Sequence, residues 1–205
     1  MIVPRQKDAW DELYRSQFRP WKGVTSDTVF PFKKGAKILD VGCGNGKTSF
    51  ALMEAGYNVV GIDISDVAVE TYNRMYEGRM KAICASAASI PMEDGEMDGA
   101  VMIHVLEHMT EEESKQALAE LRRVLRPDSR IFVRVFHKDD MRSGKGERID
   151  DNTVVRGNGI RYRYFTEAEL KTLFSDLSEI SMRRIEDKTK FREIRSKIEA
   201  VFEIP

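Results

Sequence analysis

The sequence predicts an α/β fold: a doubly wound, mostly parallel sheet of seven strands with helices on both faces and an antiparallel C-terminal strand. Short apolar runs alternate with helical patterns from residue 36 to residue 136, and this alternation is typical of parallel strands joined by helices. The first apolar run passes directly into a glycine loop at 42–46. The last two apolar runs, 178–185 and 197–204, are expected to close the sheet as an antiparallel pair.

Each element follows from a local pattern. Trp10 and Tyr14 stand at helical spacing and predict a helix before the sheet. Ser65 and Thr166 are expected helix caps, and Pro127 stops the charged helix that precedes it. The expected helices are 6–18, 47–55, 65–76, 111–125 and 166–174, and the expected strands are 36–41, 58–62, 80–84, 99–103, 130–136, 178–185 and 197–204.

The 205 residues are expected to form a single domain, because the chain has an ordinary domain length and shows no repeat, low-complexity tract or linker. Residues 1–30 would supply an N-terminal helix and cap. Residues 137–165 would form an insertion near the ligand site. From His137 to Gly159 the sequence shows no helix or strand periodicity in its hydrophobic residues and is rich in Gly, Asp, Asn and Arg.

Composition narrows the class of protein. Hydrophobic residues make up 41% and charged residues 33% of the chain, as in a globular protein, and 33 basic residues nearly balance 34 acidic ones. Overall charge therefore gives no reason to expect a membrane or nucleic acid partner. Cys43 and Cys84 lack the spacing of a zinc site or a disulfide framework, so no metal is expected. No signal peptide or membrane span is apparent, and a cytoplasmic location is expected.

The glycine loop is built to approach a ligand closely. In ILDVGCGNGKTS, the glycines at 42, 44 and 46 remove the Cβ atoms that would hold a ligand away from the backbone. Asp63 follows the second strand, where a carboxylate can accept hydrogen bonds from both hydroxyls of a ribose. These features predict a nucleoside ligand beyond the carboxyl ends of the strands.

Dinucleotides and S-adenosylmethionine are the two nucleoside ligands that compete for such a loop. The dinucleotide fingerprint G-x-G-x-x-G requires a glycine where this chain has Lys47. Asp40 would also repel a pyrophosphate, whereas it suits the ammonium group of an amino acid. Glycine spacing and charge therefore favour S-adenosylmethionine.

Three blocks together carry a family resemblance: ILDVGCGNG, GIDIS and SIPMEDGEMDGAVMIHVLEHM. In this order and spacing the chain resembles the class I S-adenosylmethionine-dependent methyltransferases, in particular small single-domain members of types 11 and 25. The resemblance is close over residues 36–136 and holds in outline elsewhere. It implies a Rossmann-like fold, S-adenosylmethionine as cofactor and S-adenosylhomocysteine as product.

The resemblance also implies roles for individual residues. Asp40 and the loop from Gly42 through Cys43 and Gly44 to Gly46 would hold the methionine portion, and Asp63 the ribose. Ile64 would line the adenine, with Ser86 and Ala87 where many relatives have an acidic residue that reaches the adenine amino group. The remaining residues expected at the cofactor are His104, beside the transferred methyl, and Tyr14 and Trp21, in an aromatic segment that covers it.

Two histidines are candidate catalytic residues. Methyl transfer from a sulfonium is an in-line displacement, so alignment in a dry cavity can supply most of the catalysis. Where the nucleophile must lose a proton, histidine is the natural base. His104 and His137 end the fourth and fifth strands and are both expected to open into the crevice, with His104 either the base or a wall of the cofactor pocket. Glu107 and His108 are expected to serve the start of a helix instead.

Local charge is the guide to the acceptor. Residues 142–163 include six basic and three acidic side chains, and Arg alternates with Tyr in RYRYF. Arg142, Arg161 and Tyr162 are therefore candidate substrate residues for an anionic small molecule, unless they belong to an ordinary solvated loop. The first alternative is an RNA (tRNA) methyltransferase that uses the basic C-terminal half, residues 142–163 together with the basic stretch 183–197. A non-catalytic cofactor-binding module is a second alternative, which the intact glycine loop disfavours.

Overall fold

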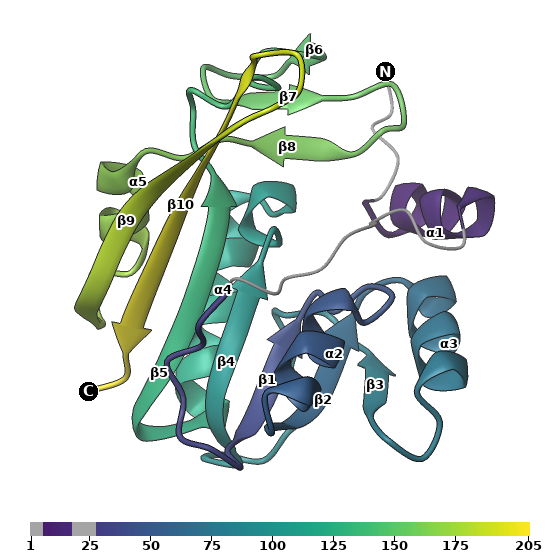
Figure 1. The fold of residues 1–205 in the computed structure, drawn as a ribbon, viewed down its shortest axis with the longest axis vertical. Coiled ribbons are helices and arrows are strands. Elements are labelled where there is room, and N and C mark those ends of the chain that lie inside the picture. The colour runs from purple at the N-terminus through teal and green to yellow at the C-terminus, as the bar shows by residue number, and fades with distance from the viewer. Residues whose placement is uncertain (1–5, 18–27) are drawn as a thin grey trace.

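The computed structural model describes residues 6–17 and 28–205. Its main sheet has seven strands in the order β3-β2-β1-β4-β5-β10-β9 (Figure 1). The first five are parallel, β10 is antiparallel to β5, and β9 is antiparallel to β10. The predicted α/β sheet with an antiparallel C-terminal end is thus confirmed. Its strands are β1 (Lys37–Val41), β2 (Asn58–Asp63), β3 (Lys81–Cys84), β4 (Met97–Ile103), β5 (Leu125–Phe136), β9 (Ser178–Lys188) and β10 (Ile194–Glu203).

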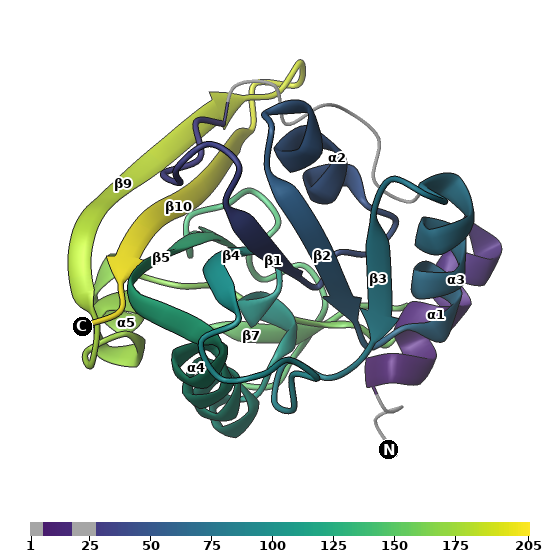
Figure 2. The same ribbon diagram turned by 90° about the horizontal axis from the view of Figure 1, so that it is seen from below.

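Helices cover both faces of the sheet. Figure 2 shows α4 and α5 on one side and α2 on the other. Leu121 and Phe174 belong to one buried cluster with the sheet, and Leu52 and Tyr72 belong to a second. The helices are α1 (Gln6–Ser16), α2 (Lys47–Glu54), α3 (Asp66–Met75), α4 (Glu111–Val124) and α5 (Glu167–Leu173), with a short 3-10 helix η1 (Leu106–His108) after β4.

The expected caps form. The Ser65 hydroxyl accepts the N–H of Ala68 at the start of α3, and Thr166 forms a capping box with Glu169 at the start of α5. These side chains satisfy N–H groups that have no partner within the helix. No helix in the described part of the chain combines the length and the apolar character needed to cross a bilayer.

The insertion is more ordered than the sequence suggests. It contains a separate antiparallel sheet of β6 (Glu147–Arg148), β7 (Thr153–Val155) and β8 (Arg161–Arg163). Strands of two or three residues are too short to display alternation, which explains why the pattern is not legible in the sequence. Val154, Ile160 and Tyr162 pack in one cluster with Ala9 of α1. The insertion and α1 therefore meet above the carboxyl ends of the main strands (Figure 1).

Candidate active site

A cavity of about 810 Å³ opens at the carboxyl ends of β1, β2 and β4, where the strand order reverses. Its walls come from α1, the loops after β1 to β4, the end of β5, the small sheet, and β9 and β10. The residues singled out from the sequence that line it are Tyr14, Gly42, Cys43, Gly44, Asp63, Ile64, Ser86, Ala87, His104, Arg142 and Tyr162. Asp40, Gly46, His137 and Arg161 do not line it, and Trp21 lies outside the described residues.

Asp63 and the glycine loop are joined by a hydrogen bond. Oδ2 of Asp63 accepts the backbone N–H of Gly44 over 2.8 Å, and Oδ1 accepts the N–H of Ser65 over 2.9 Å. Burial raises the pKa of the Asp63 carboxyl, while these two donors act in the opposite direction. Because each carboxylate oxygen keeps a further lone pair, Asp63 can still accept the two hydroxyls of a ribose.

Helix α1 covers the loop. Gly44 has a φ of +52°, and a Cβ at this position would overlap the hydroxyl of Tyr14. Only glycine permits this close approach. The helix is also tied to the turn after β2, because Oδ1 of the buried Asp11 accepts the Ser65 hydroxyl over 2.6 Å. Tyr14 is therefore held as a wall of the cavity.

Asp40 and Gly46, which the resemblance assigns to the methionine portion, do not line the cavity. Asp40 is 1% exposed, and its Oδ2 accepts the Ser49 hydroxyl over 2.5 Å, so it links β1 to α2. Four of the five residues of β1 are buried, and Asp40 is among them. Gly46 has a φ of +84°, and a Cβ there would overlap the ring of Tyr76. The absence of a Cβ at Gly46 therefore allows the start of α2 to pack closely against the end of α3.

The adenine end of the predicted site consists of small and apolar groups. Ile64 and Ala87 line the cavity. Ser86 also lines it, but its Oγ accepts the N–H of Ala88 over 3.1 Å. The serine therefore stabilises its own loop, and its hydroxyl is a weaker substitute for the acidic residue that many relatives carry here.

His104 stands at the end of β4 in an unusual conformation. Its φ is +57°, a region that non-glycine residues seldom adopt. Its Nδ1 lies 2.8 Å from Oε1 of the fully buried Glu107, and that oxygen also accepts the N–H of Phe136 over 2.9 Å. The imidazole stacks on the Phe136 ring at a centroid distance of 4.1 Å. Glu107 thus connects His104 to Phe136 of β5 through one carboxylate oxygen. The sequence had indicated only a role at the start of a helix.

His108 is a second cavity residue that the sequence interpretation assigned to the start of a helix. Its Nδ1 is 2.6 Å from the carbonyl oxygen of Arg161, so Nδ1 carries the proton. Its ring meets Trp10 and Tyr162 edge to face, each at 4.8 Å. Burial lowers the pKa of His108, which favours the neutral ring. His108 therefore joins α1 to the small sheet.

His137 and Arg161, candidates from the sequence for catalysis and substrate binding, do not line the cavity. Each is the sequence neighbour of a lining residue, Phe136 or Tyr162, and successive side chains of a strand face opposite sides. His137 is 2% exposed, and its Nδ1 accepts the N–H of Asp139 over 3.1 Å. Arg161 supports the site through its backbone, whose N–H and carbonyl bond to α1 and to His108.

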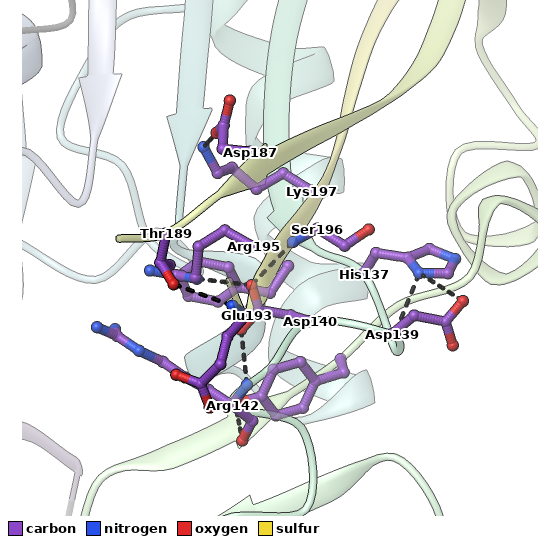
Figure 3. A network of polar contacts seen from close by, with 12 residues as sticks. His137, Asp139, Asp140, Arg142, Asp187, Thr189, Glu193, Arg195, Ser196 and Lys197 are labelled. Atoms are coloured by element: carbon purple, nitrogen blue, oxygen red, sulfur yellow. Dashed lines mark hydrogen bonds and ion pairs between the residues drawn. The ribbon is translucent and has the colours of Figure 1, made fainter. Parts of the chain in front are cut away.

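Arg142 brings positive charge to the cavity wall. The buried Asp140 fixes its segment by accepting the N–H groups of Arg142 and Ser196 and the Nε–H of Arg195 (Figure 3). The guanidinium of Arg142 makes no hydrogen bond or ion pair within the described residues. Burial, then the charges of Arg195 and Arg156, lower the pKa of Arg142. The positive charge of Arg142 is therefore not neutralised by a partner in this part of the cavity wall.

A further cationic wall comes from strands distant in sequence from the glycine loop. Arg134 of β5 and Arg183 of β9 both pair with the buried Glu199 of β10. Lys47 has no hydrogen bond or ion pair within the described part of the chain, and burial followed by the charges of Arg134 and Lys197 lowers its pKa. All five residues line the cavity. The sequence marks residues 183–197 as basic but does not place them at the cavity, because only the sheet order puts β10 beside β5 and β9 beside β10.

The described residues fit S-adenosylmethionine. Gly44 leaves no room for a side chain beneath Tyr14, and the Asp63 carboxylate keeps acceptor capacity for a ribose. Ile64 and Ala87 offer apolar surface for adenine in the same cavity. When bound, this cofactor supplies an electrophilic methyl group on a sulfonium. The chain's own contribution would be to hold it between the loops after β1, β2 and β3.

The chain is similar in sequence to known methyltransferases. The family model of the methyltransferase domain (Methyltransf_11) matches residues 39–133. The tRNA N(3)-cytidine methyltransferase METTL2B of Homo sapiens is 32% identical over 153 residues, which cover 68% of this chain and 40% of the human protein. The O-methyltransferase rstn1 of Aspergillus nomiae is 37% identical over 106 residues, covering 49% of this chain and 46% of that protein. The chain thus spans less than half the length of these relatives.

Among solved structures, an S-adenosylmethionine-dependent methyltransferase from Methanosarcina mazei shares the fold with a TM-score of 0.73 and 22% identity, over 86% of this chain and 98% of that chain. The matched domain begins within β1 and ends within β5, so it includes the glycine loop, Asp63 and His104. Residues 39–133 therefore form a methyltransferase domain, and the chain has the fold of the class I S-adenosylmethionine-dependent methyltransferases.

Proposed function

We propose that this methyltransferase acts on a phosphate-bearing acceptor, and that the acceptor is a cytidine of tRNA. The observation that carries the proposal is the guanidinium of Arg142, which lines the same cavity as His104 and has no partner within the described residues. Arginine is suited to phosphate because its planar fork can bind two oxygens at once. The similarity to tRNA N(3)-cytidine methyltransferases supports cytidine as the base.

The cavity also suits an unstacked base. Enzymes that modify a nucleobase bring it out of the stack, and proteins hold such bases between flat side chains. Here the rings of Trp10, His104, Phe136 and Tyr162 all line the cavity. Ring N3 of cytosine is a neutral nucleophile with an available lone pair, so alignment toward the donor methyl can suffice without removal of a proton.

A small anionic molecule, the acceptor that sequence analysis favours, is the second candidate. Two observations keep it in view. The chain spans only 40% of the length of the human tRNA enzyme, so the substrate of that enzyme does not transfer directly to this chain. The similarity to an O-methyltransferase is higher in identity, although over fewer residues. The same arginine would then bind a carboxylate or phosphate of the small molecule.

Methyl transfer from labelled S-adenosylmethionine tests the proposal. Purified protein is incubated with unmodified tRNA transcripts and, separately, with a panel of small carboxylates and phosphates, and labelled nucleosides are separated after digestion. We expect label in a methylated cytidine, with tRNA binding that weakens steeply as salt rises. Label in the small-molecule panel but not in tRNA would overturn the tRNA proposal. Transcripts in which the labelled cytidine is replaced by uridine are the matched control.

A further inference from the structure

The contact between His104 and Glu107 constrains which ring nitrogen of His104 carries a proton. Oε1 of Glu107 accepts the N–H of Phe136 over 2.9 Å and lies 2.8 Å from Nδ1 of His104. An imidazole nitrogen is more basic than a carboxylate oxygen, so the proton between them resides on Nδ1. In the neutral ring Nε2 is then the acceptor.

The geometry aims Nε2 at the cavity. Glu107 is fully buried, so the Nδ1 edge of the imidazole faces the protein interior. One face of the ring rests on Phe136. The imidazole is nevertheless 30% exposed and lines the cavity, and Nε2 has no hydrogen-bond partner within the described residues. The ring therefore presents a hydrogen-bond acceptor to the same cavity that Asp63 and Arg142 line.

The arrangement has energetic costs that packing alone does not explain. Oε2 of Glu107 is a buried oxygen without a hydrogen-bond partner in the described part of the chain, and such groups are costly in a protein interior. His104 also adopts a left-handed φ of +57°. Strained backbone and unpaired buried polar groups concentrate at functional sites. A role in recognition gives both features a reason.

We propose that Glu107 is a positioning residue that fixes His104 as the Nδ1–H tautomer, so that Nε2 selects an acceptor substrate with an N–H or O–H donor at that point. The inference rests on the proposed function. For cytosine the donor is the exocyclic amino group next to ring N3. Uracil carries a carbonyl oxygen in its place, which would face the lone pair of Nε2. The pair would thus distinguish cytosine from uracil, since a site built to bond an N–H rejects an analogue that lacks it.

The first test does not depend on any substrate. Nitrogen-15 spectra of the histidine rings at pH 8 report which nitrogen of each neutral ring is protonated, and a His104→Gln variant assigns the His104 signals. We expect protonated Nδ1 and unprotonated Nε2 in the wild-type protein. The opposite tautomer, or an equal mixture, at His104 of the wild-type protein overturns the inference. If the variant fails to fold, correlation of each ring with its own backbone amide in the wild-type protein assigns the signals.

The second test compares two substitutions of Glu107. Glu107→Gln keeps an oxygen where the Phe136 N–H anchors it, so the tautomer and the cytosine preference should persist. Glu107→Ala removes that oxygen, so the spectra should show mixed tautomers. With tRNA as substrate, Glu107→Ala should lower kcat/KM by about 100-fold and reduce the preference for cytidine over uridine, a loss in the range expected for an unpaired polar group in a binding site. Affinity for S-adenosylhomocysteine should stay unchanged, which confirms a folded cofactor site.

The two proposals fail in different ways. Wild-type protein that methylates no tRNA overturns the tRNA function, whereas the tautomer can still be read from the spectra and the donor requirement tested on the small-molecule panel. Methylation of tRNA with Glu107→Ala indistinguishable from wild type, in both tautomer and base preference, overturns the role of Glu107.

Discussion

The backbone N–H of Gly44 donates to Oδ2 of Asp63 over 2.8 Å, so the glycine loop after β1 and the carboxylate after β2 form one unit. A change in either residue should therefore disturb both the position of the loop and the contacts of the ribose. The two are 19 residues apart in sequence but meet because β1 and β2 are parallel neighbours.

Asp63→Ala should weaken cofactor binding strongly. The substitution removes the acceptor for the ribose hydroxyls and the partner of the Gly44 N–H, and each charge-assisted hydrogen bond contributes about 1.5 to 3 kcal/mol. Titration calorimetry with S-adenosylhomocysteine should show a loss of affinity of at least about 100-fold. Asp94→Ala, at an exposed position outside the cavity, is the control and should bind normally. Equal affinities for the two variants would refute the role of Asp63.

Gly44→Ala should weaken cofactor binding by more than the backbone strain of a positive φ accounts for. Gly78 also has a positive φ, +71°, but nothing lies within 4 Å of a Cβ placed there, so Gly78→Ala measures the backbone cost by itself. That cost is about 1 kcal/mol. At Gly44 the added methyl also meets the Tyr14 hydroxyl, so cofactor affinity should fall only in this variant.

The steric cause can be isolated with a double variant. Combining Gly44→Ala with Tyr14→Phe removes the hydroxyl that the new methyl meets, so part of the lost affinity should return. A double variant no better than Gly44→Ala would show that the Tyr14 contact is not the cause. Urea unfolding of the wild type, Gly44→Ala, Gly78→Ala and the double variant separates effects on stability from effects on binding.

Local patterns in the sequence were enough to predict the parallel strands and the positions of Gly44 and Asp63. Each depends on residues close in sequence: an apolar run, a glycine without a Cβ, or a carboxylate at the end of a strand. The cap residues Ser65 and Thr166 were predictable for the same reason, because a cap and the N–H that it accepts lie three residues apart.

What escaped prediction depends on tertiary contacts. The place of Asp40 in the motif suggested a cofactor ligand, but the motif did not indicate its burial or its hydrogen bond with Ser49. Glu107 acquires its function only because β5 brings the Phe136 N–H to it. The direction of His137 depended on which side of β5 faces the cavity, and one residue along a strand reverses that side.

Asp40 should make the stability of the protein depend on pH. Burial raises the pKa of this carboxyl from an ordinary 3.8 to about 7 in the folded protein. The folded state therefore binds the proton more tightly than the unfolded state, and the stabilisation from the protonated form is complete below pH 3.8 and lost as pH rises to about 7. Asp40→Asn cannot ionise. The unfolding free energy of the wild type relative to Asp40→Asn should fall by several kcal/mol between pH 4 and 7 and stay level above it. Parallel pH curves for the two proteins would contradict the assignment.

Arg142→Ala should affect the acceptor substrate and spare the cofactor. The guanidinium lines the cavity beside Tyr162, whereas Arg161, one residue earlier in β8 than Tyr162, does not line it. Arg161→Ala in the same insertion is therefore a matched control for loss of one positive charge. For the acceptor found in the labelling experiment, Arg142→Ala should raise KM by about 10-fold or more, the effect of a hydrogen bond to a charged group. Arg161→Ala should change KM by less than about 2-fold, as expected for a surface charge. Affinity for S-adenosylhomocysteine should be unchanged in both variants. If the two substitutions raise KM equally, the effect is one of overall charge, and Arg142 does not bind the acceptor directly.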